Sequence, residues 1–161
     1  MKKLIFTILI IASLTNNSFS AGSGDDSADK KSNYSKAYNL IKSAKKYEKK
    51  GKTEKSKKRY LKAQKLLLLS NKEKPLQADT LNYLGFTTRK LGDYEKGEEF
   101  YLQGLKIEPN HNGINEYLGE LYIATNRMDL AKERLEVLKS CDCKEYKQLK
   151  EIIEGTKKSK Y

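Results

Sequence analysis

Apolar residues recur along most of the chain at the spacing of an α-helix, three or four positions apart. Tyr94, Tyr101 and Leu105 fall on one helical face in the middle of the chain, and Leu149 and Ile152 do the same near its end. No stretch alternates apolar and polar residues as a half-buried strand does. Only two prolines interrupt the 161 residues. The pattern predicts an all-α protein.

The helical pattern is also periodic. Leu84 and Gly85 are followed 34 residues later by Leu118 and Gly119, and the same frame continues backwards at an offset of 41 because seven residues are inserted around 71–77. A 34-residue period that breaks near its middle is typical of stacked helix-turn-helix units. The period predicts units over residues 37–70, 78–111 and 112–145. An amphipathic segment over 146–156 is then expected to cap the stack.

Two kinds of glycine position carry structural information. Gly85 and Gly119 lie inside the first helix of their units, where glycine costs about 1 kcal/mol relative to alanine. We therefore expect the second helix of each unit to approach closely there. Gly92 and its counterpart Asn126 lie just past a first helix, where a left-handed cap conformation suits both residue types.

With these features the chain resembles the tetratricopeptide repeat family. The middle unit carries most of the family's pattern, in Leu84, Gly85, Gly92, Asp93, Tyr94, Tyr101 and Pro109. The outer units keep less of it: Ala44, Tyr47, Gly51, Tyr60 and Ala63 in the first, and Leu118, Gly119, Tyr122, Ala131 and Leu135 in the third. Gly97 and Gly104 replace alanines that the family uses for packing. The resemblance implies an α-solenoid of about three repeats plus a capping helix.

The resemblance also implies a function, because in this family the first helices line a concave groove that holds a protein or peptide. The corresponding positions here are Tyr38, Ile41, Lys45, Asn82, Phe86, Arg89, Lys90, Glu116, Glu120 and Ile123. Ile41, Phe86 and Ile123 are apolar and lie off the packing stripe. They either anchor a partner in the groove or pack against flanking helices. Some members of the family hold the tail of a chaperone with basic residues on the first helix of the third unit. The resemblance does not imply that function here, since residues 113–120 contain no basic side chain.

The first twenty residues have the layout of a secretory signal peptide. Two lysines precede a short apolar run, and small residues precede a cut between Ser20 and Ala21. An uncleaved anchor is the alternative, although the run is short for a bilayer of about 30 Å. We expect a periplasmic protein with a flexible polar tether over residues 21–33 and a repeat domain over 34–161.

The net charge of +12 is concentrated in one region. Residues 29–65 contain 15 Lys and Arg against 3 Asp and Glu, whereas residues 66–161 contain 16 of each. The basic residues within 30–65 either attract an anionic surface of lipid, polysaccharide or protein, or form a solvated face in a chain with 29 Lys and 4 Arg. Nucleic acid is not an expected partner, because no nucleic-acid-binding motif is present.

Residues able to carry out chemistry are few. The single histidine, His111, lies in an inter-unit loop, and no phosphate-binding loop or paired metal-ligand motif occurs, so we predict no catalytic residues, cofactor or metal. Cys141 and Cys143 are one residue apart. In an oxidising compartment they could form a local disulfide, remain as structural thiols, or serve redox exchange or metal binding, with His111 as a further ligand. A redox or metal-handling accessory is therefore the alternative function.

Overall fold

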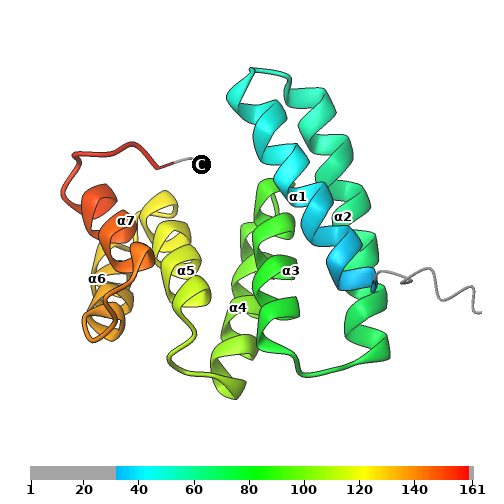
Figure 1. The fold of residues 1–161 in the computed structure, drawn as a ribbon. Coiled ribbons are helices and arrows are strands. Elements are labelled where there is room, and N and C mark those ends of the chain that lie inside the picture. Colours follow the sequence, from blue (N-terminus) through cyan, green and yellow to red (C-terminus); the bar gives the residue numbers. More distant parts are fainter. Residues whose placement is uncertain (1–31, 160–161) are drawn as a thin grey trace, which may run out of the picture. The chain divides into compact units, whose positions relative to one another are not determined.

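The computed structural model of the protein describes residues 32–159, which form seven helices and no strand (Figure 1). The helices are α1 (Asn33–Lys49), α2 (Thr53–Glu73), α3 (Ala78–Lys90), α4 (Tyr94–Ile107), α5 (Asn112–Ala124), α6 (Met128–Leu138) and α7 (Lys144–Ile153). The all-α prediction is confirmed. The predicted signal peptide, its cleavage site and nearly all of the tether lie outside the described residues.

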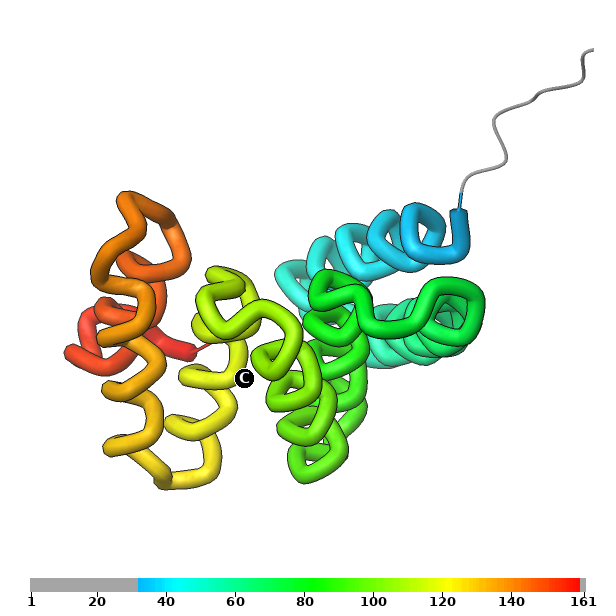
Figure 2. Tube along the Cα trace, turned by 90° about the horizontal axis from the view of Figure 1, so that it is seen from below, coloured from blue at the N-terminus to red at the C-terminus, as the bar shows by residue number. Residues whose placement is uncertain are grey.

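The helices pack as successive hairpins in chain order. α1 packs on α2, α3 on α4 and α5 on α6, and α7 packs on both α5 and α6 (Figures 1 and 2). Neighbouring hairpins meet through contacts of α2 with α3, α4 with α5 and α3 with α5. The predicted stack of helical hairpins is therefore present. None of the helices within residues 32–159 is long and apolar enough to span a bilayer.

The turn inside each hairpin has the same backbone conformation. Gly51, Gly92 and Asn126 have positive φ angles of 67°, 100° and 59°. In each turn, one amide donates a hydrogen bond to the carbonyl five residues earlier: Lys52 to Tyr47, Asp93 to Thr88, and Arg127 to Tyr122, at 2.9, 3.2 and 2.7 Å. The left-handed caps predicted at Gly92 and Asn126 are confirmed, and they satisfy carbonyls that the helix end leaves without partners.

Gly85 allows α4 to lie close to α3, as its position in the sequence predicts. A Cβ atom placed on Gly85 would come within 2.5 Å of the Tyr101 ring, which is fully buried. Gly119 has a different neighbour from the one expected. A Cβ there would meet the Leu149 side chain of α7 at 2.6 Å, because α7 packs against α5 at this point. The capping helix therefore makes the close approach that we expected from the second helix of the unit.

Candidate binding pocket

The first helices of the three hairpins and α7 together surround a pocket, which we call the interhelical pocket. Its volume is ≈ 540 Å³. It is lined by Lys45, Glu48 and Lys49 of α1, by Asn82, Tyr83, Phe86 and Lys90 of α3, by Gly113, Glu116, Tyr117 and Glu120 of α5, and by Lys144, Glu145 and Gln148 of α7. No residue of α2, α4 or α6 belongs to this lining.

Two aromatic rings and one lysine form a compact group in the pocket. The Phe86 and Tyr117 ring centroids are 5.0 Å apart, and Lys45 Nζ lies 4.4 Å from the Phe86 centroid. The same ammonium donates a hydrogen bond to the Tyr117 hydroxyl at 3.1 Å. Burial raises the pKa of the Tyr117 phenol, so the hydroxyl stays neutral at physiological pH. The pocket thus offers an apolar surface with a fixed positive charge beside it.

The charged side chains of the lining are balanced in number. Four lysines and four glutamates line the pocket, namely Lys45, Lys49, Lys90 and Lys144 with Glu48, Glu116, Glu120 and Glu145. Lys90 Nζ lies 2.7 Å from Glu48 Oε1, and the Tyr60 hydroxyl donates to Glu48 Oε2 at 2.8 Å. Most of the lysines come from α1 and α3, whereas both charged lining residues of α5 are glutamates. The lining therefore favours a ligand that carries polar groups of both signs.

Asn82 contributes a polar group whose hydrogen bonding is incomplete. Its side chain is 4% exposed, it belongs to the pocket lining, and its Oδ1 has no hydrogen-bond partner among the described residues. A buried acceptor without a partner costs about 1–3 kcal/mol. A donor that enters the pocket beside Asn82 would recover part of this free energy.

Comparison with known proteins agrees with this architecture. A tetratricopeptide repeat family model matches residues 78–111, which contain α3 and α4. The translocator chaperone SycD of Yersinia enterocolitica has 14% sequence identity and a TM-score of 0.53, with 73% of this chain and 81% of SycD covered. The chain therefore contains a tetratricopeptide repeat over residues 78–111, within a stack of helical hairpins. A chain of the CopN-Scc3 complex is also similar in fold, with 18% identity, a TM-score of 0.50, and 86% and 83% of the two chains covered. No curated protein matches the sequence.

Six of the ten groove residues that the family resemblance implies line the interhelical pocket: Lys45, Asn82, Phe86, Lys90, Glu116 and Glu120. The other four lie elsewhere. Ile41 is buried in the core between α1, α2 and α3, and Ile123 packs against the core around α5 and α6. The Tyr38 ring lies edge-on to Tyr83, with 5.5 Å between centroids. Of the three apolar candidates, therefore, only Phe86 lines the pocket.

Arg89 is the fourth groove candidate that does not line the pocket, and it lies beneath the lining. Its side chain is fully buried, and Nη1 donates to the Tyr117 carbonyl oxygen at 2.7 Å. Nη2 lies 3.4 Å from Glu120 Oε2. These contacts join α3 to α5 inside the protein. The expectation that Arg89 contacts a partner in the groove is corrected: the residue joins two repeats, because its long side chain reaches the backbone of the next first helix.

The resemblance did not indicate the lining residues of α7. Lys144, Glu145 and Gln148 belong to the pocket, although we expected this segment only to cover the last unit. A signal was nevertheless present, because α7 begins 32 residues after α5 and thus close to the repeat period. In this stack of hairpins α7 takes the place of a fourth first helix, and its side chains therefore contribute to the pocket.

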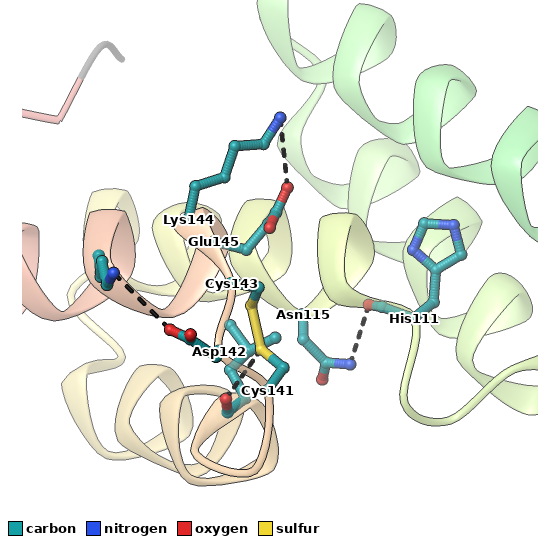
Figure 3. The surroundings of a disulfide bond; sticks show 9 residues. His111, Asn115, Cys141, Asp142, Cys143, Lys144 and Glu145 are labelled. Carbon is teal, nitrogen blue, oxygen red and sulfur yellow. Dashed lines mark hydrogen bonds and ion pairs between the residues drawn. A yellow bond between two sulfur atoms is a disulfide. The ribbon is translucent and has the colours of Figure 1, made fainter.

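The two cysteines form a disulfide immediately before α7 (Figure 3). Cys143 occupies the N-cap position of that helix, so the next residue, Lys144, already belongs to the pocket lining. Bonded sulfur atoms are not thiolates, so neither cysteine is a metal ligand in this state. No cluster of three or more potential metal-binding side chains is found within residues 32–159.

His111 has a capping role at the start of α5. Its Nδ1 accepts a hydrogen bond from the Ile114 amide at 3.1 Å, and its Nε2 lies 3.2 Å from Asp79 Oδ1. Figure 3 shows the His111 ring turned away from the disulfide. Both ring nitrogens therefore serve the junction between the second and third hairpins.

Replacing both cysteines with serine is expected to leave the fold intact and to lower the free energy of unfolding by about 1–2 kcal/mol at most. The loop that the disulfide closes is very short, so its loss restores little chain entropy to the unfolded state. Chemical unfolding of the Cys141→Ser, Cys143→Ser variant measures this difference. Thiol titration of the unreduced protein should find little free thiol, and two reactive thiols would contradict the disulfide.

Proposed function

We propose that the protein is a non-enzymatic, periplasmic interaction scaffold that holds an extended segment of a partner protein in the interhelical pocket. The observation that carries this proposal is the incompletely hydrogen-bonded Asn82 in a pocket built by all three repeats and α7. An extended peptide has unpaired backbone amides at regular intervals. One such amide can donate to Asn82 Oδ1 while an apolar side chain of the peptide contacts the partly exposed Tyr117 ring, which packs on Phe86.

The family supports this type of function without naming the partner. SycD is a translocator chaperone, and the second structural neighbour belongs to a complex between two proteins. Those descriptions apply to the neighbours, whose likeness to this chain extends to the fold. They motivate a search for a protein partner in preference to a small-molecule substrate.

The periplasmic location is supported by the layout of residues 1–20, which is that of a cleaved signal peptide. N-terminal sequencing of the protein purified from its source cells tests this part independently. A first residue at or near Ala21 is expected. A full-length chain in the cytosol would remove the basis for export.

A photocrosslinking amino acid at Lys49 or Gln148 tests the pocket itself, since both residues belong to its lining. In the source cells, both positions are expected to yield the same crosslinked protein. A crosslinker at Lys132 of α6, which is exposed and outside the pocket, is the matched control and should not capture it. Equal capture from Lys132, or none from the pocket positions, would contradict the proposal.

Asn82→Ala is expected to weaken binding of the captured segment about fivefold to tenfold, because one buried hydrogen bond contributes about 1 kcal/mol. Titration of a synthetic peptide from the crosslinked region measures the change. Moderate salt should alter the affinity little, since the charges lining the pocket balance. Phe86→Ala and Arg89→Ala are unsuitable as binding tests, because Phe86 packs in the core and Arg89 pairs with Glu120, so their removal disturbs the fold. Asn82 Oδ1 has no hydrogen-bond partner within the described residues to lose.

A redox accessory is the second candidate, favoured by the partly exposed disulfide beside α7. Its chemistry would be exchange with a dithiol partner, in which the partner is oxidised and Cys141 and Cys143 are reduced. Incubation with a reduced dithiol protein and quantification of free thiols tests this exchange. No transfer over the time in which that protein reduces a model disulfide would retire the candidate.

A further inference from the structure

The exposed side of α2 combines positive charge with exposed leucines. The buried residues of this helix, Ser56, Tyr60, Ala63, Leu67 and Ser70, form one stripe that faces α1 and α3. The opposite side consists mainly of Lys55, Lys57, Lys58, Leu61, Lys62, Lys65, Leu68, Leu69 and Lys72, all of them exposed. We call this set the α2 outer face. None of it belongs to the interhelical pocket.

The leucines of this face are accessible to a partner. Leu61, Leu68 and Leu69 are 42%, 49% and 50% exposed, and they are spaced seven and one residues apart. Side chains seven residues apart stand two turns apart on the same side of a helix. One exposed leucine is ordinary on a protein surface, but Leu61 and Leu68 share a side of the helix and Leu69 adjoins Leu68, so the three form an apolar strip interrupted by lysines. No other described helix covers them, because α2 packs only on α1 and α3.

The lysines around this strip carry charge that the protein does not neutralise. No acidic residue occurs between Glu54 and Glu73, a stretch that holds seven Lys and Arg. Within residues 32–159, the six lysines of the α2 outer face form no ion pair. Near the start of the helix, Lys55, Lys58, Arg59 and Lys62 surround an open hollow of ≈ 640 Å³ that also contains Tyr47 and Leu61. This hollow has cations and apolar atoms but no carboxylate.

We propose that the α2 outer face docks on the surface of an anionic lipid bilayer. Lysines alone would suit any polyanion, but the leucines between them have no matching group on a polysaccharide or nucleic acid. A bilayer surface offers both kinds of contact, since its headgroups are negative and its acyl chains lie just below them. The hollow would receive one anionic headgroup. Because α2 is separate from the pocket lining, membrane docking and partner binding can occur together.

Vesicle binding distinguishes affinity for a lipid surface from a general affinity for polyanions. The test is flotation of the full-length chain with vesicles of phosphatidylcholine containing about one third phosphatidylglycerol, compared with phosphatidylcholine alone. Residues 1–31 are identical in every variant, so differences between variants report on the substituted helix. Binding to the anionic vesicles is expected to exceed binding to the neutral ones and to weaken steeply as salt is added.

Two variants of the α2 outer face are compared with two matched controls. Reversing Lys58, Lys62 and Lys65 to glutamate is expected to reduce partitioning about a hundredfold, and changing Leu61, Leu68 and Leu69 to serine about tenfold. The control for charge reverses Lys106, Lys132 and Lys147, which are exposed on other helices, and the control for apolar surface changes Leu102 and Ile107 of α4 to serine. Both controls should change binding less than about threefold. All substitutions are at exposed sites, so unchanged helical circular dichroism confirms folding.

Three results would overturn the proposal. The first is equal binding to neutral and anionic vesicles. The second is an equal loss in the control variants, which would remove the assignment to α2. The third is vesicle binding that is lost in the lysine variant but unchanged in the leucine variant, when both the unchanged protein and the leucine variant also bind heparin. That result would identify the face as a site for soluble polyanions or acidic proteins.

Discussion

Arg89→Met is expected to lower the free energy of unfolding by about 3–5 kcal/mol, the range observed when one partner of a buried ion pair is removed. The Arg89 guanidinium is buried between α3 and α5 and contacts both the Tyr117 carbonyl and the Glu120 carboxylate. Methionine has a similar length but no charge, so the buried Glu120 carboxylate would lose this ion pair. Urea unfolding followed by circular dichroism measures the loss.

Two controls separate this effect from ordinary truncation of an arginine. Arg127 pairs with both carboxylate oxygens of Glu98, at 2.9 and 2.6 Å, but this pair is partly exposed. Arg127→Met is therefore expected to cost only about 1 kcal/mol. Adding Glu120→Leu to Arg89→Met should recover part of the loss, since it removes the buried carboxylate whose ion pair with Arg89 is gone. Equal costs for Arg89→Met and Arg127→Met would show that burial of the Arg89 pair has no special role.

Gly85→Leu is expected to cost about 3 kcal/mol, near the upper end of the range for overpacking in a core. The first added carbon already meets the Tyr101 ring at 2.5 Å, and this ring is enclosed on all sides. The hairpin of α3 and α4 would have to separate to accept the larger side chain. The midpoint of thermal unfolding should fall by several degrees, on the order of 5–15 °C for a domain of this size.

The equivalent glycine of the third repeat supplies a matched comparison. At Gly119 an added Cβ meets the end of the Leu149 side chain, which is aliphatic and not a planar ring, and α7 is the last described helix of the stack, packed on one side only. Gly119→Ala should therefore cost less than Gly85→Ala. The gain in helix propensity, about 1 kcal/mol, is the same at both positions and cancels in the comparison. A greater cost at Gly119 would contradict the contacts described for both helices.

Much of the fold could be predicted from the sequence, because its signals are local. The helical spacing of apolar residues identifies the helices, and Gly92 and Asn126 mark the turns through a backbone conformation that few other residues adopt. The period of 34 residues then specifies that the hairpins repeat. Because these signals are local, the family model matches the middle repeat, which carries the most complete pattern.

The binding surfaces depended on contacts between residues far apart in the chain. The repeat frame placed Arg89 with the groove residues, but its burial depends on Tyr117 and Glu120, which are 28 and 31 residues away. Similarly, the run from Leu66 to Leu69 could belong to a core on either side of its helix. Only the packing of α1 and α3 against one side of α2 leaves Leu68 and Leu69 exposed among lysines. The sequence thus determined where helices form and turn, because these preferences act within a few residues. The tertiary structure decided which side chains partners can reach, because burial is a property of neighbours that the chain brings together only on folding.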